Sequence, residues 1–102
     1  MGFEEVIKST KKYSEHVVNS LHPKMIVLFG SYANGSANND SDIDIAVIYD
    51  SIGEDFLEKS QQLYKLRRGI DLRIEPVLLE RENDKSGFCE EVLKTGVIIY
   101  SA

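Results

Sequence analysis

The sequence lacks several features that would point away from a single soluble domain. It has one cysteine in 102 residues, Cys89, so an internal disulfide is excluded and a thiolate zinc site cannot form from it alone. No apolar run approaches the length of a membrane span, and the opening MGFEEVIKSTKK has no signal-peptide core. Repeats, linkers and low-complexity segments are also missing. We therefore expect one domain over residues 1–102, located in the cytoplasm and not in a membrane.

An excess of positive charge is missing as well. The chain has 17 acidic residues against 12 Lys and Arg, for a formal net charge of −5. A general nucleic-acid binder presents a basic face to phosphates, so we expect no direct contact with nucleic acid. An acidic balance suits a partner with a basic surface, but it also serves solubility, and the charge alone does not decide between them.

The apolar pattern predicts an α/β (α+β) fold with a mixed β-sheet of about four strands flanked by helices. In chain order it predicts a helix over Phe3 to Leu21, a strand buried on both faces over Lys24 to Phe29, a loop over Gly30 to Ser41 with one helical turn near its start, a strand over Asp42 to Tyr49, a helix over Glu54 to Arg67, a strand over Ile70 to Leu79, a helix over Gly87 to Thr95, and a last strand, VIIYS.

Side-chain alternation assigns the faces of the two long strands. In the first, Ile43, Ile45, Val47 and Tyr49 oppose Asp42 and Asp44; in the second, Ile70, Leu72 and Ile74 oppose Asp71, Arg73 and Glu75. The helix between them is predicted to turn Phe56, Leu57, Leu63, Tyr64 and Leu66 inward. The acidic faces are then expected to look into a cleft, where the three aspartates converge.

The negative charges of Asp42 and Asp44 on one face of a strand need a compensating positive charge, because close carboxylates repel and burial raises the free-energy cost of the charged form. A divalent cation is the usual compensation, and hard oxygen ligands suit Mg²⁺. Gly30 would let the backbone approach a phosphate, and Ser31 offers a hydroxyl and an N–H. A third carboxylate, Asp71, would hold a second metal or accept a proton from an attacking hydroxyl.

These residues resemble a known family. Gly30-Ser31, ten residues, then Asp42-Ile43-Asp44 is similar to the GS-x10-DxD signature of the DNA polymerase beta-like nucleotidyltransferase superfamily. The stretch FGSYANGSANNDSDIDIAVI and the ending LKTGVIIY look most like its minimal nucleotidyltransferase domains, which are about this long. Many relatives read GSxARG, and here Asn34 stands where they have arginine.

The resemblance implies a Mg²⁺-dependent transfer of a nucleoside monophosphate, expected to be AMP from ATP, with release of pyrophosphate. Asp42, Asp44 and Asp71 would bind two catalytic ions, and Gly30 and Ser31 would hold the triphosphate. Minimal domains of this kind are often paired with a small helical HEPN-type protein in toxin–antitoxin pairs, so the resemblance implies a protein hydroxyl as acceptor and an antitoxin role. A homo- or hetero-oligomer is compatible with this.

Other interpretations of the same residues stay open. Alternating acids also occur on solvated strand faces, and Asp71 could lie on a solvated edge. A glycosyltransferase DxD would require a larger nucleotide-sugar domain, and a drug-modifying nucleotidyltransferase would require a substrate domain. The main alternative is a catalytically weak or inactive nucleotide-binding module that neutralises a partner by complex formation. The Asn34 position and the small size favour it.

Overall fold

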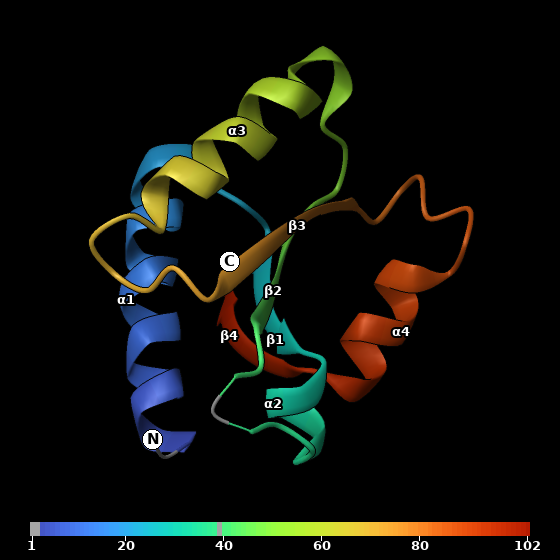
Figure 1. Cartoon of the computed structure of the whole chain (residues 1–102). Helices are drawn as coiled ribbons and strands as arrows, with labels where there is room; N and C mark the ends of the chain where they lie inside the picture. The colour runs from blue at the N-terminus through green and yellow to red at the C-terminus, as the bar shows by residue number, and fades with distance from the viewer. Residues whose placement is uncertain (1–2, 39) are drawn as a thin grey trace.

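The computed structural model describes residues 3–38 and 40–102 as helices on both faces of one β-sheet (Figure 1). Its elements in chain order are α1 (Phe3–Leu21), β1 (Met25–Phe29), α2 (Ser31–Asn34), β2 (Ile43–Tyr49), the 3-10 turn η1 (Gly53–Asp55), α3 (Phe56–Leu66), β3 (Ile74–Glu80), α4 (Phe88–Thr95) and β4 (Val97–Ser101). The predicted fold class is confirmed, and so is the helical turn near the start of the loop after β1.

The four strands lie in the order β3-β2-β1-β4. β1 pairs antiparallel with β2 and with β4, whereas β2 and β3 run parallel, so the sheet is mixed. The parallel pair needs a long crossover, which the η1–α3 segment provides. β1 and β2 are therefore the central strands, and β3 and β4 form the edges.

Two apolar layers explain why β1 and β2 are so rich in Ile and Val. On one face, α1 and α3 cover a core that includes Tyr13, Ile45 and Leu63; on the other, α4 covers a smaller core with Ala46 and Val92 (Figure 1). A strand buried on both faces reads as a continuous apolar run, as predicted for β1. Among the described residues, every helix is too short or too polar to cross a membrane.

Two predictions about the second half of the chain are wrong. Leu57 is 68% exposed, and Phe56 and Tyr64 are also exposed, so α3 turns only a narrow stripe with Leu63 to the core. The last long strand begins at Ile74, not Ile70, and Leu72 is 68% exposed in the preceding turn. Residues 70–73 form a turn despite their alternating pattern, because the Asp71 carboxylate accepts a hydrogen bond from the Arg73 backbone N–H at 3.0 Å.

Candidate active site

The two aspartates of the DxD motif lie where β2 begins. Asp42 is exposed just before the strand, and Asp44 is half-buried as its second residue. Residues two apart on a strand point to the same side, so both carboxylates belong to one surface. Further along that side of β2, Ala46 and Ile48 are buried beneath α4, so the acids occupy only the end of the strand.

Gly30 packs its backbone directly against Asp44. It follows β1, whose Phe29 is the antiparallel partner of Asp44, and it has a φ of 73°, which side chains rarely adopt. A Cβ on Gly30 would overlap Oδ2 of Asp44. The glycine of the signature is thus required by a close approach to the second aspartate, which brings the two halves of the motif together.

The loop that follows Gly30 is held by its own hydrogen bonds. The Gly30 carbonyl accepts from the N–H groups of Ala33 and Asn34, each at 3.1 Å, and the Ser31 carbonyl accepts from Ser36 N–H at 3.0 Å. Oδ1 of Asn34 accepts from the N–H and the hydroxyl of Ser36, at 3.0 and 2.6 Å. Asn34 therefore stabilises the turn. Ser31 directly follows Gly30, the glycine that packs against Asp44.

The electrostatics of Asp44 distinguish it from a solvated strand residue. Burial raises the pKa of the Asp44 carboxyl above its ordinary value, and the nearby carboxylates of Asp42 and Glu75 raise this pKa further. Carboxyl groups with raised pKa values are concentrated at functional sites, because a negative cluster at a protein surface needs a cation or a proton.

The sequence places Glu75 on the same strand face as Asp71 and leaves open whether it contacts the nucleotide or forms a surface ion pair. In the parallel pairing of β2 and β3, Glu75 is the direct partner of Asp44. Its carboxylate accepts a hydrogen bond from the Tyr64 hydroxyl at 3.2 Å and lies 3.8 Å from Nη1 of Arg67. A signal existed in the sequence: Ile43-Asp44 and Ile74-Glu75 are matching apolar–acid pairs at the starts of two neighbouring strands.

Asp71, the predicted third carboxylate, has different neighbours. Nη2 of Arg73 donates to its Oδ2 at 2.7 Å and Nε donates to its Oδ1 at 3.0 Å. These hydrogen bonds hold the pKa of Asp71 below its usual value, and a hydrogen bond from Ser9 on α1 adds to the effect. Over the described residues there is no cluster of three or more acidic, His or Cys side chains able to hold a metal. Asp71 is therefore held by Arg73, and its role beside Asp42 and Asp44 stays a prediction.

The donor set nonetheless fits a hard divalent cation. Asp42 and Asp44 supply carboxylate oxygens on one surface, where burial and the neighbouring carboxylates of Asp42 and Glu75 raise the pKa of Asp44. Mg²⁺ is typically bound by one or two protein carboxylates, with phosphate oxygens and water completing its coordination. The site thus suits a metal that arrives with a polyphosphate better than a metal caged by protein alone.

The mixed sheet, the glycine-serine turn and the strand-borne aspartate pair define a nucleotidyltransferase-type domain. The family model described as polymerase beta, nucleotidyltransferase matches residues 6–102, so the chain belongs to that family. A Methanocaldococcus jannaschii protein provisionally assigned as a protein adenylyltransferase is 27% identical over 99 residues, which cover 91% of this chain and 97% of that protein.

Two solved structures share the fold. A provisionally assigned nucleotidyltransferase from Sulfolobus solfataricus has a TM-score of 0.72 and 24% identity, covering 97% of this chain and 83% of that one. A toxin–antitoxin structure with AMP-PNP has a TM-score of 0.61 and 25% identity, covering 90% of this chain and 73% of that one. The two structures show the fold, and the family match with the archaeal relative identifies this protein as a nucleotidyltransferase enzyme.

Proposed function

We propose that this protein transfers AMP from ATP to a hydroxyl group of a partner protein, with Mg²⁺ as the bound ion and cytoplasm as the compartment. The observation that carries the proposal is the acid pair Asp42 and Asp44, in which Asp44 packs against Gly30 and has a raised pKa. The protein-adenylyltransferase assignment of the archaeal relative supports a protein acceptor, and the toxin–antitoxin structure with AMP-PNP supports an adenine nucleotide and a partner chain.

The proposed chemistry is a displacement at the α-phosphorus of ATP. The acceptor oxygen forms a bond to that phosphorus, the bond to the bridging oxygen of the β-phosphate breaks, and pyrophosphate leaves. Asp42 and Asp44 would hold Mg²⁺, which when bound neutralises charge on the phosphates. Gly30 and Ser31 would hold the triphosphate, and a third carboxylate accepts the proton from the acceptor hydroxyl.

For the third carboxylate we propose Glu75 as an alternative to Asp71, which the sequence predicts for this role. Glu75 is in register with Asp44 and contributes to its raised pKa, whereas Asp71 is neutralised by Arg73. Two short hydrogen bonds from a guanidinium make Asp71 a poor proton acceptor, whereas the Arg67 guanidinium lies 3.8 Å from Glu75, beyond hydrogen-bond distance. The Tyr64 hydroxyl and Arg67 would orient the Glu75 side chain.

The partner is proposed to be a small helical HEPN-type protein that this chain neutralises as an antitoxin. The first experiment incubates the purified chain with Mg²⁺, the product of the neighbouring gene and ATP labelled at the α- or the γ-phosphate. Label on the partner from α- but not γ-labelled ATP supports nucleotidyl transfer. The double variant Asp42→Asn with Asp44→Asn should lose transfer, whereas Asp55→Asn, an exposed acid in η1, should not. Transfer by the double variant at the wild-type rate would refute the mechanism.

A nucleotide-binding module that neutralises its partner by complex formation is the second candidate. The specific observation in its favour is Asn34, whose side chain is bonded to Ser36 where many relatives would present an arginine to a phosphate or acceptor. The same double variant discriminates. Full protection of cells from the toxin by that variant points to binding, and lost protection with a retained complex points to catalysis.

A further inference from the structure

The two edges of the sheet are built differently. On the β3 edge, Pro76 has no backbone N–H to donate, Glu75 and Glu80 bring charge, and Nη1 of Arg67 donates to the Ile74 carbonyl at 2.9 Å. Proline, charge and covering side chains are the devices by which edge strands avoid pairing with another chain. The β3 edge is therefore protected.

The β4 edge carries none of these side chains, although it is a short strand whose pairing with β1 shifts register between Ile26 and Val27. Its sequence is VIIYS, without a charge or a proline, and it lies on the outer side of β1. Val97 is 38% exposed and Ile98 is 54% exposed. An edge strand with free backbone groups and apolar side chains is a template for a further strand.

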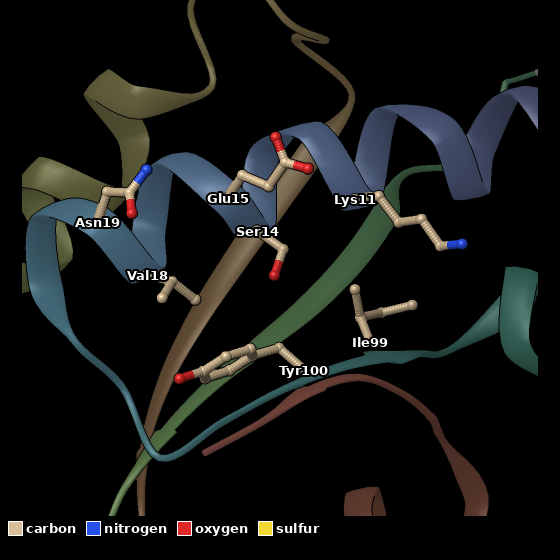
Figure 2. A pocket seen from close by; sticks show the side chains of 7 residues that line it. All are labelled: Lys11, Ser14, Glu15, Val18, Asn19, Ile99 and Tyr100. Carbon is tan, nitrogen blue, oxygen red and sulfur yellow. The ribbon is translucent and has the colours of Figure 1, made fainter.

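A groove of about 390 Å³ runs between this edge and α1 (Figure 2). Its floor combines apolar side chains with a hydroxyl group: Val18 and Ser14 of α1 point toward Tyr100, and Ile99 lies beside it. Its rim on α1 carries Lys11 and Glu15, two opposite charges about one helical turn apart. The groove lies at β4, with β1 between it and the acid-bearing β2, so it is separate from the candidate active site.

We propose that this surface, the β4 edge with the α1 rim, binds a second copy of the chain in a two-fold dimer. The two β4 strands pair antiparallel and join the two four-stranded sheets into one continuous sheet. In such an arrangement both α1 helices lie on the same face and run antiparallel across the axis. A two-fold axis between Lys11 and Glu15 then places each beside its opposite charge in the second copy.

The charges favour a second copy over an unrelated strand. Each chain has a formal net charge of −5, so two copies repel unless opposite charges meet locally. Lys11 and Glu15 form a self-complementary pair that an isologous interface satisfies twice. An unrelated strand would need its own matching charges, and nothing on this surface specifies them.

Sedimentation of the wild-type chain tests the proposal first, and a mass twice that of the 11.5 kDa chain is expected. Ile98→Lys puts a charge on the bare edge and should raise the dimer dissociation constant by about 10-fold or more. Leu57→Lys is the matched control, because Leu57 is an exposed leucine on α3, and it should leave the constant unchanged. Circular dichroism checks that each variant is folded.

A charge exchange tests the two-fold symmetry itself. Lys11→Glu alone should weaken the dimer, and adding Glu15→Lys in the same chain should restore it. Restoration supports pairing with a second copy, because an unrelated partner would not change its own charges in step. A wild-type chain that sediments as a monomer, a dimer unaffected by Ile98→Lys, or a double variant no tighter than Lys11→Glu would each overturn the proposal.

Discussion

At the scale of single residues, Gly30 sets the geometry of the acid pair. Gly30→Ala would bring a methyl group onto Oδ2 of Asp44 and strain a backbone with φ of 73°. We expect a loss of about 1–3 kcal/mol in unfolding free energy and a fall in AMP transfer of about 10-fold or more, because Asp44 must move. Urea denaturation and label transfer measure the two effects.

Gly53→Ala is the matched control for that substitution. Gly53 also has a positive φ, of 75°, but a Cβ there meets no atom within 4 Å, and the residue lies in η1. It should cost stability without lowering transfer by the folded protein. Equal activity in the two variants would contradict the role assigned to Gly30.

Asp44 should destabilise the protein when no cation is bound. Its folded pKa is raised above the unfolded value of 3.8, so its unfavourable contribution is absent at lower pH and appears as pH rises through the folded pKa. Asp44→Asn, measured with chelator present, should therefore gain unfolding free energy at neutral pH and nothing near pH 3. A gain that does not depend on pH would argue against this origin.

Substitutions of Glu75 and Asp71 are expected to have opposite effects on AMP transfer and on stability. Glu75→Gln should lower transfer by about 100-fold, the usual size for a proton-accepting group, while stability changes by less than about 0.5 kcal/mol. Asp71→Asn should cost about 1–3 kcal/mol, because it breaks a charge-assisted pair with Arg73, and should leave transfer by the folded fraction close to wild type. The reverse pattern would restore Asp71 as the third carboxylate.

At the scale of elements, a hydrogen bond from Tyr49 connects the end of α1 to the sheet. Its hydroxyl donates to the Leu21 carbonyl at 2.6 Å, and burial raises the pKa of Tyr49 to about 12. Tyr49→Phe should cost about 1 kcal/mol at neutral pH. The wild type should lose this advantage as pH rises from 10 to about 12, because the unfolded phenol ionises first. A difference that stays constant between about pH 8 and 12 would contradict the assignment, since this range spans the ordinary pKa of a tyrosine.

Individual elements also differ in how well the sequence predicts them. Helical periodicity predicts α1, a continuous apolar run predicts β1, and the spaced glycine-serine and aspartate motif is enough to single out Asp42 and Asp44. The start of β3 escapes prediction because IDLRIE alternates like a strand, while the Asp71 side chain closes a turn that alternation cannot reveal. Glu75 escapes because its partnership with Asp44 depends on lateral register between two strands far apart in sequence.

At the scale of the whole molecule, the strand order gathers the site at one end of the sheet. β2 lies between β1 and β3, so the turn after β1 delivers Gly30 to one side of Asp44, and the start of β3 delivers Glu75 to the other. The unprotected β4 edge lies on the far side of β1. Dimerisation there would leave the acid pair accessible to nucleotide and acceptor.

Ligand binding should therefore appear in the stability of the entire chain. Mg²⁺ with a non-hydrolysable ATP analogue at about 100 times the dissociation constant should add about 2.7 kcal/mol, or roughly 10–20 °C in Tm for a domain of this size. Mg²⁺ alone should give a smaller shift, because two carboxylates need phosphate oxygens to complete the coordination. Asp42→Asn should abolish most of the combined shift, and Asp55→Asn should retain it. A full shift in Asp42→Asn would place the nucleotide elsewhere on the molecule, whereas a full shift in the wild type without AMP transfer would favour the binding module over the enzyme.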